Sequence, residues 1–547
     1  MARLDRLGPA SKEIAQIGAV LGREFVYELI ESVATRPEKE LQAALGQLDD
    51  AGLLFCRGTA PHASYLFKHA LVQDAAYSTL LRGRRQELHA RVAATLDERF
   101  TDLVERQPEL LAHHLSAAGN ADRAVEQWLQ AGRHAAGRLA YLEAIAHFER
   151  GLGLLHSLPE GQVRDGREIE LQLALGLCLF PAKGAVEAKL PYTRALELAE
   201  SSGAPLQRFE ALYGVWQSNL VSGRITGARP LSERLLRMAE REGDDGLRLQ
   251  AHHSGWSTWA LAGDAAKTRE HADAGRHLYD ANRHASHRLV YGGHDPGVCA
   301  RYMGAHAEWL LGHPEKALGS TSDSLALAGR IAHPFTLSTA LILTSVVYLN
   351  RREPQHALRQ LEAAEALAAE QRLSLMLEPG ILRGVALAGQ GADDEAIARI
   401  REGVASWTRL GRTIFLPYGF AFLAEGLARH GDRLAALAAL REGLETAAAT
   451  GEHFWDAELH RLTGTVLLAE NKLDEGQASL QCAIRIAQAQ QAKSLELRAA
   501  TSLARLWGER RRRNEARDLL APVYGWFTEG FDTPDLKDAK ALLDELG

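Results

Sequence analysis

Small and hydrophobic residues recur along this chain with one fixed spacing pattern. Each repeat is anchored on a small residue, and the last six anchors are 40, 39, 40, 40 and 40 residues apart. The ten anchors are Ala144, Ala188, Ala228, Thr268, Ala317, Ala357, Ala396, Ala436, Gly476 and Ala516. A fixed period of this length is typical of stacked helical repeats.

The residues around each anchor predict how the helices pack. An apolar residue usually follows four positions later and a small or apolar residue seven positions later, as Phe148 and Gly151 follow Ala144. These spacings place the side chains on one helix face. Another small residue, such as Gly132, stands twelve positions before most anchors, on the preceding helix. Since alternating strand patterns are almost absent after residue 70, we predict an all-α solenoid of about ten repeats.

The first hundred residues follow a different pattern. The order of predicted elements is three helices and then a short hairpin, at 11–20, 25–33, 37–52, 53–56 and 64–67. This order is typical of a winged helix. Two further helices, at 70–81 and 84–100, lead into the repeats. We therefore predict a winged-helix-like module at 1–68, a helical connector at 69–120 and a tetratricopeptide-like superhelix at 121–547.

Charge argues against nucleic acid as a partner. The third predicted helix would be the DNA-recognition helix, yet it carries Glu38, Glu40, Asp49 and Asp50 against the single Lys39. DNA affinity depends on cations that face the phosphates. The net charge of the whole chain, −7, points the same way.

Composition favours a reducing compartment. The chain has four scattered cysteines and no CxxC pair, so a disulfide framework is not expected. No apolar run reaches the length of a membrane span, and no signal peptide opens the sequence. We expect a soluble, cytoplasmic protein with no membrane contact.

Several stretches outside the repeat positions resemble a known family. They lie at 67–77 (FKHALVQDAAY), 108–114 (PELLAHH), 294–298 (HDPGV), 491–500 (QAKSLELRAA) and 524–533 (YGWFTEGFDT). The first resembles the segment that follows the nucleotide-binding module in signal-transduction ATPases of the STAND type. Together they resemble the C-terminal half of large bacterial proteins that join a class III adenylate/guanylate cyclase domain, an AAA-like ATPase and tetratricopeptide repeats.

The chain departs from that family in its catalytic parts. A P-loop requires a Gly-Lys pair, and this sequence contains none. No segment supplies the paired aspartates of a cyclase core. We therefore expect no enzymatic activity, and we interpret the chain as a separate or truncated product or a fragment of a longer protein.

The longest spacing between anchors marks the candidate site. Thr268 and Ala317 are 49 residues apart, and the extra residues fall at 282–297. Tryptophan replaces the usual small residue in the two repeats beside this insertion. The candidate ligand- or peptide-binding residues are Trp216, His252, Trp256, Trp259, Tyr291, His294 and Asp295. Two interpretations stay open: these residues line a concave binding surface, or the tryptophans fill a wider gap between helices and the loop is a structural plug.

The histidines of this region are candidate metal ligands. His271, His277, His284, His287 and His294 cluster loosely in the sequence, but no nearby cysteine or paired carboxylates complete a tetrahedral set. We expect no metal and no cofactor.

The function these features favour is protein interaction. We expect a non-catalytic regulatory module that binds a protein or peptide on its concave face and contacts an ATPase or cyclase domain. The alternatives are a winged-helix transcription regulator with a repeat sensor domain, and a small-ligand sensor.

Overall fold

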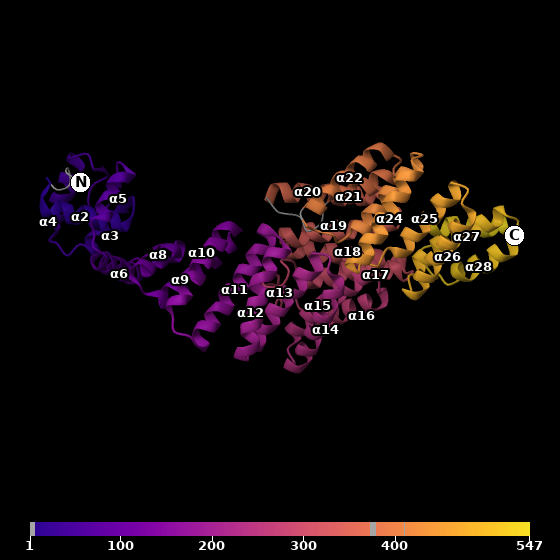
Figure 1. Cartoon of the computed structure of the whole chain (residues 1–547), viewed down its shortest axis with the longest axis horizontal. Helices are drawn as coiled ribbons and strands as arrows, with labels where there is room; N and C mark the ends of the chain where they lie inside the picture. The colour runs from indigo at the N-terminus through magenta and orange to yellow at the C-terminus, as the bar shows by residue number, and fades with distance from the viewer. Residues whose placement is uncertain (1–5, 372–378, 410) are drawn as a thin grey trace. The chain divides into compact units, whose positions relative to one another are not determined.

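The computed structural model describes residues 6–371, 379–409 and 411–547, and these are mostly helical (Figure 1). The chain divides into two compact units, Met1–Ala182 with Glu197–Gly203, and Lys183–Leu196 with Ala204–Gly547. We describe each unit by itself. Among the described residues, no helix combines the length and the apolar character that crossing a membrane requires.

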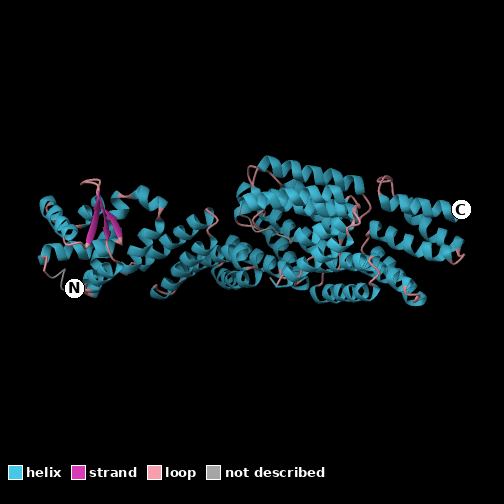
Figure 2. Cartoon of the chain, turned by 90° about the horizontal axis from the view of Figure 1, so that it is seen from above, coloured by secondary structure: helices cyan, strands magenta, loops and turns pink. Residues whose placement is uncertain are grey.

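A small antiparallel sheet lies near the N-terminus (Figure 2). Its elements run α2 (Gly8–Leu21), β1 (Glu24–Val26), α3 (Tyr27–Val33), α4 (Glu38–Asp50), β2 (Leu54–Arg57) and β3 (Ser64–Phe67). The strand order is β1-β3-β2, and Phe25 pairs with Tyr65 while Phe55 pairs with Leu66. The predicted module at 1–68 begins with five residues that lie outside the described part of the chain.

One predicted helix of this region was wrong at its start. The stretch 25–33 was expected to be entirely helical, but its first two residues complete strand β1. The reason is packing: the ring of Phe25 is buried and stacks on Tyr65 of β3 at 5.8 Å between centroids. This pairing outweighs the helical preference of the residues that follow.

Helices fill the rest of the chain. The first set is α5 (Ala70–Ser78), α6 (Arg82–Arg99), α7 (Thr101–Arg106), α8 (Pro108–Ala118), α9 (Ala121–Gly137), α10 (Tyr141–Leu154), α11 (Gln162–Lys183) and α12 (Ala185–Ser202). The second set is α13 (Pro205–Val221), α14 (Ile225–Glu242), α15 (Asp245–Ala262), α16 (Ala265–Leu278), α17 (Pro296–Leu310), α18 (Pro314–Ile331), α19 (Pro334–Asn350) and α20 (Pro354–Gln371). The last set is α21 (Pro379–Ala388), α22 (Asp393–Arg409), α23 (Leu416–Arg429), α24 (Arg433–Thr450), α25 (Asp456–Ala469), α26 (Leu473–Ala489), α27 (Lys493–Glu509), α28 (Arg513–Gly525) and α29 (Pro534–Leu546).

Small residues set the closeness of the helix pairs, as the sequence predicts. A β-carbon added at Gly132 of α9 would lie 2.1 Å from the Phe148 ring of α10. The same relation joins Gly464 of α25 to Leu480 of α26, at 2.8 Å. Each small residue therefore packs against a large residue of the next helix, the one four positions after the next anchor. This interlocking buries a continuous core.

Within the second unit, helices far apart in sequence meet along a line that we call the seam. Thr413 donates to the carbonyl oxygen of Ser222, 191 residues away, and Ser494 donates to that of Trp309, 185 residues away. His453 N–H donates to Leu261 O at 2.9 Å. The ends of α13, α15 and α17 thus meet the beginnings of α23, α25 and α27.

A buried ion-pair network strengthens the seam. Arg498 of α27 donates to Asn350 O at 2.6 Å and pairs with Asp535 at 2.7 Å. Its guanidinium also lies 5.1 Å from the ring centroid of Trp309. Contacts between successive turns of the solenoid therefore stabilise the second unit in addition to the contacts between neighbouring repeats.

Candidate functional site

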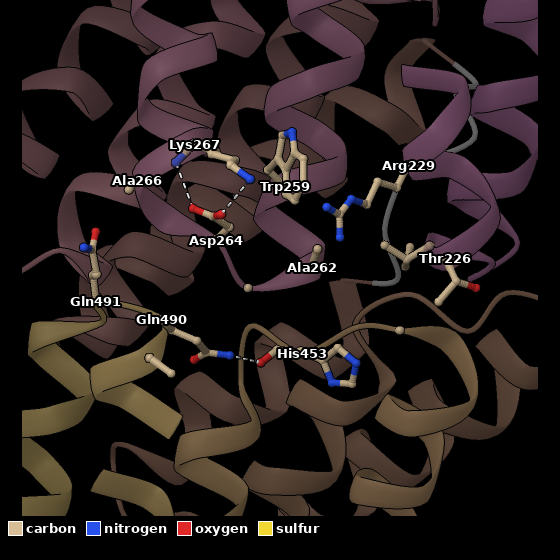
Figure 3. Close-up of a pocket in the computed structure, with 14 residues that line it drawn as sticks. Thr226, Arg229, Trp259, Ala262, Asp264, Ala266, Lys267, His453, Gln490 and Gln491 are labelled. Carbon is tan, nitrogen blue, oxygen red and sulfur yellow. Dashed lines mark hydrogen bonds and ion pairs between the residues drawn. The ribbon is translucent and has the colours of Figure 1, made fainter. Parts of the chain in front are cut away.

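A cleft of about 690 Å³ opens at the seam (Figure 3). We call it the seam cleft. One wall comes from α14, α15 and α16 and the other from the turns around α25 and α27; the lining residues are Ile225, Thr226, Arg229, Trp259, Ala262, Gly263, Asp264, Ala266, Lys267, Gly451, His453, Ala489, Gln490 and Gln491. This volume lies within the range of ligand-binding clefts.

Trp259 is the aromatic residue of this cleft. The Arg229 guanidinium lies 4.4 Å from its ring centroid and the Lys267 ammonium 3.8 Å from it. Figure 3 shows the indole between these two side chains. Cation–π contacts of this kind hold an aromatic ring in one orientation.

Carboxylates balance the two cations of the cleft. Asp264 pairs with Lys267 at 3.5 Å and also caps α16 by accepting from the Lys267 N–H at 2.9 Å. Arg229 pairs with Glu233 at 3.3 Å. The wall around Trp259 is therefore nearly neutral, which suits a segment of peptide better than a highly charged ligand.

Hydrogen bonds hold the opposite wall of the cleft, around His453 and Gln490, in place. Gln490 donates its side-chain N–H to His453 O at 2.8 Å (Figure 3). Gly263, which has a left-handed φ of 84°, sits against both residues, and a β-carbon there would lie 2.7 Å from the Gln490 amide nitrogen. Asp456 accepts a hydrogen bond from the His453 ring and raises the pKa of that histidine.

The structure places the seven candidate residues in three different environments. Trp259 lines the seam cleft. His252 is half-buried on α15, with its Nδ1 2.9 Å from Nδ1 of His271, and does not line the cleft. The other five are buried in the interior and line no open surface; they are Trp216, Trp256, Tyr291, His294 and Asp295. A ligand in the seam cleft would therefore meet Trp259 and not these five.

The two tryptophans at small-residue positions pack between helices. Trp216 donates its indole N–H to Thr258 at 2.8 Å, and Trp256 donates to Cys299 Sγ at 3.2 Å. The Trp256 ring occupies the space that Gly275 leaves open, since a β-carbon there would lie 2.3 Å from Cζ3. A glycine on the partner helix thus makes room for a large ring.

Part of the inserted segment 282–297 packs inward, while Leu289 and Val290 are exposed. His284, Tyr291, His294 and Asp295 are all buried. Asp295 caps α17 by accepting from the N–H groups of Gly297 and Val298, and its other oxygen accepts from Tyr279 at 2.9 Å. The carboxylate of Asp295 is therefore used to begin a helix.

A cysteine joins the histidines of this segment in the folded chain. No nearby cysteine was expected to join the histidines, but Cys299 follows His294 by five residues and lies beside it in the core. The partner that completes the group, His253, comes from α15. We call His253, His294 and Cys299 the His–Cys cluster; their nearest donor atoms all lie within 4.8 Å of one another.

Burial dominates the protonation of this cluster. It lowers the pKa of His294 to about 4 and raises the pKa of the Cys299 thiol to about 12. It also holds the pKa of His253 well below its usual range. Both imidazoles and the thiol are therefore neutral near pH 7.

The chain was compared with protein families, with curated proteins and with solved structures. No protein-family model matches it. A protein of Rhizobium meliloti (strain 1021) that is named only as uncharacterized is 28% identical over 517 residues, which make up 92% of this chain and 49% of that protein. The chain thus spans about half the length of this curated relative.

Solved structures with similar architecture have low sequence identity. The Rap protein complexed with Competence and Sporulation Factor has a TM-score of 0.48 at 14% identity, over 67% of this chain and 98% of that one. A STAND protein with a tetratricopeptide repeat sensor from Pyrococcus horikoshii has a TM-score of 0.37 at 11% identity, over 88% of this chain and 63% of that one. The chain itself is an all-α solenoid of tetratricopeptide-like helical repeats.

Proposed function

We propose that this chain is a non-catalytic interaction module and that the seam cleft binds a peptide segment of a protein partner. The observation that carries the proposal is Trp259, an aromatic ring held between two cations in the wall of a cleft. Aromatic anchors in desolvated pockets supply much of the binding energy of protein interfaces. The cleft joins two turns of the solenoid, so a bound peptide would contact both.

The setting we propose is a signalling system of the STAND ATPase or nucleotide cyclase type. The stretches at 67–77, 108–114 and 294–298 support this, because they lie outside the repeat positions and resemble that family. The chain would sense a peptide signal and pass it to an ATPase or cyclase domain. Any nucleotide chemistry would belong to those domains.

We also propose the division into a winged-helix-like module at 1–68, a connector at 69–120 and a superhelix at 121–547. The first turn of α4 carries Glu38 and Glu40. Because this acidic turn would repel phosphates, the module is proposed to contact protein and not DNA.

The test uses the full chain and a defined probe. A phage-displayed library of random peptides is panned on the wild-type chain, and the enriched peptides are synthesised and titrated by fluorescence anisotropy. We expect a shared motif whose binding is lost in Trp259→Ala. Failure of any peptide to enrich, or binding that Trp259→Ala leaves unchanged, would contradict the assignment of the cleft.

The signalling partner is tested separately. Residues 101–547 serve as bait in the lysate of the source cell, and the captured proteins are identified by mass spectrometry. Capture of a nucleotide cyclase or a STAND ATPase supports the proposed setting. Capture only of proteins outside these classes counts against the proposed signalling system. It does not affect the assignment of the cleft, which the peptide titration tests.

A further inference from the structure

The His–Cys cluster brings together three groups of the kind that bind zinc. His253 lies on α15, His294 precedes α17 and Cys299 lies in the first turn of α17, and these two helices are in contact (Figure 1). Imidazole nitrogen and thiolate sulfur are the usual zinc ligands in proteins. None of the three side chains reaches the seam cleft.

Hydrogen bonds at Nδ1 prepare both histidines to bind a metal through Nε2. His294 Nδ1 donates to Gly292 O at 3.0 Å, since a carbonyl oxygen can only accept. His253 Nδ1 lies 3.1 Å from both the side-chain oxygen of Gln250 and the hydroxyl of Tyr213. When His253 Nδ1 donates to Gln250, which is oriented by a bond of 2.9 Å from its amide nitrogen to His287, the Nε2 lone pair of each ring is available to a metal. Outer-shell carbonyls of this kind orient metal-ligating histidines.

The lone pair on His294 Nε2 accepts no hydrogen bond from the described residues. His294 is 5% exposed, and its Nε2 is buried without a hydrogen-bond partner among the described residues. A buried polar atom without a hydrogen-bond partner destabilises the folded state. Such atoms are rare in folded proteins and call for an explanation, and a bound ion is one of the established ones.

The spacing of the donor atoms fits a tetrahedral ion. His253 Nε2 lies 3.5 Å from Cys299 Sγ. With Zn–N and Zn–S bonds of about 2.0–2.3 Å, ligand atoms at tetrahedral angles are about 3.3–3.8 Å apart. The third residue, His294, has a ring nitrogen within 4.8 Å of the other two donor atoms, so the side chains must move closer together to complete the triangle around an ion.

We propose that His253, His294 and Cys299 bind one Zn²⁺ ion that ties α15 to the 282–297 segment and α17. The ion would take the thiolate form of Cys299, and the thiol proton would leave to solvent as the metal binds. The three side chains fill three of four positions. The fourth falls to a water molecule or to the hydroxyl of Tyr302, which hydrogen-bonds Cys299.

The enclosed position of the site makes its role structural. Trp256 donates to the sulfur, and the rings of Trp256 and His253 stack at 4.9 Å between centroids. Tyr302 and Tyr213 are buried beside them. An ion held here would enter during folding and would stabilise the repeats on both sides of the insertion.

Cobalt provides a direct optical test on the full chain. The wild-type chain is unfolded, stripped of metal with a chelator and refolded with Co²⁺, and its absorption spectrum is recorded. We expect about one cobalt per chain, a thiolate-to-cobalt charge-transfer band and the visible bands of a tetrahedral centre. A wild-type chain that folds and shows no thiolate-to-cobalt band would overturn the proposal, and this result requires no variant to fold.

Two variants and two matched controls locate the ion. Cys299→Ser should abolish the charge-transfer band, and His294→Gln should weaken Zn²⁺ affinity by more than about 10–100-fold, the cost of losing an outer-shell partner alone. Cys178→Ser removes another buried thiol, and His306→Gln removes a histidine of α17 that lies outside the cluster; both should keep the band. A band that survives Cys299→Ser, or that Cys178→Ser removes, would overturn the assignment.

Metal analysis of the natural ion completes the test. The chain is refolded with equal Zn²⁺ and Cu⁺ under reducing conditions and analysed by mass spectrometry. Retained zinc at about one per chain, with a melting temperature that falls on chelation, is the expected result. Retained copper without zinc would overturn the choice of ion.

Discussion

The ammonium group of Lys267 lies 3.8 Å from the centre of the Trp259 indole. Both residues line one wall of the seam cleft, and the residues on the opposite wall belong to a different turn of the solenoid. The two side chains come from neighbouring helices, α15 and α16. The relationship fixes an aromatic face at the point where two distant parts of the repeat array meet. It is therefore the feature on which the proposed peptide binding would depend most.

Replacing Trp259 should weaken peptide binding strongly. Trp259→Ala is expected to raise the dissociation constant of a library-selected peptide by about 30-fold, which corresponds to about 2 kcal/mol for an aromatic anchor. The measurement is fluorescence anisotropy with the labelled peptide. Circular dichroism reports whether the variant keeps its helical content.

Trp507 offers a matched control for this experiment. It is also covered by a cation, with the Arg512 guanidinium 4.5 Å from its ring centroid, but it lies outside the cleft. Trp507→Ala should leave the affinity unchanged. Equal losses in the two variants would mean that the cleft is not where the peptide binds.

Removing Arg498 should destabilise the second unit. Arg498→Ala removes the ion pairs to half-buried Asp535 and buried Glu458 and the bond to Asn350 O. Glu458 keeps Arg461 and Asp535 keeps Arg352, so we expect a loss below the about 3–5 kcal/mol that removing the sole partner of a buried charge costs. Urea unfolding followed by circular dichroism measures the change.

An exposed arginine provides the comparison for Arg498. Arg433 pairs with Glu470 at 3.2 Å at the surface, and loss of such a pair costs about 0–1 kcal/mol. Arg433→Ala should therefore unfold close to the wild-type midpoint. A stability loss in Arg498→Ala no larger than this would show that the seam contributes little.

The space around Gly275 is filled by Trp256. In Gly275→Ala the new β-carbon would lie 2.3 Å from Trp256 Cζ3, so the ring or the helix must move. We expect a loss of about 1–3 kcal/mol in unfolding free energy, the usual cost of overpacking. Gly319→Ala, on the exposed face of α18 with no neighbour within 4 Å, should instead gain up to about 1 kcal/mol. The reverse order of the two melting temperatures would contradict this account of the tryptophan.

Glu452 should make stability depend on pH. Burial raises its pKa to about 8, against the opposing effect of hydrogen bonds from the Phe415 N–H. The folded state therefore holds the proton more tightly than the unfolded chain. The stability that this group contributes is complete below about pH 4.5 and is lost as the pH rises to about 8.

Glu452→Gln tests this dependence. Between about pH 6 and pH 8, the stability of the wild-type chain relative to this variant should fall by up to about 1.4 kcal/mol per pH unit. The exposed Glu442→Gln variant should follow the wild-type curve. Unfolding by urea at several pH values measures all three proteins, and parallel curves for Glu452→Gln and the wild type would refute the prediction.

The repeats could be predicted from the sequence because their packing is local. Gly132 meets Phe148 sixteen residues later, and Gly464 meets Leu480 at the same spacing, so the rule is visible in any single repeat. The all-α solenoid is confirmed by the helices that the structure describes. The sequence did not predict strand β1, because the conformation of Phe25 is set by its pairing with the distant Tyr65 and not by the residues next to it in the chain.

The sites could not be predicted because they join residues from distant helices. Nothing local in the sequence indicates that Leu261 O accepts from His453, and the cleft exists only because that contact forms. The His–Cys cluster needs His253, which precedes Cys299 by 46 residues. The sequence singles out Trp259 only together with Trp216 and Trp256. All three are buried in the structure, and of the three it is Trp259 that lines the cleft.

The seam also changes how the second unit should respond to force. An open solenoid stretches like a soft spring, because each repeat holds only its neighbours. Here the coils touch, through contacts such as Ser494 to Trp309 and Arg498 to Asn350. Pulling on this unit should therefore meet a stiff response until the seam breaks, followed by compliant extension, and a peptide that bridges the two walls of the cleft would raise the force at which that break occurs.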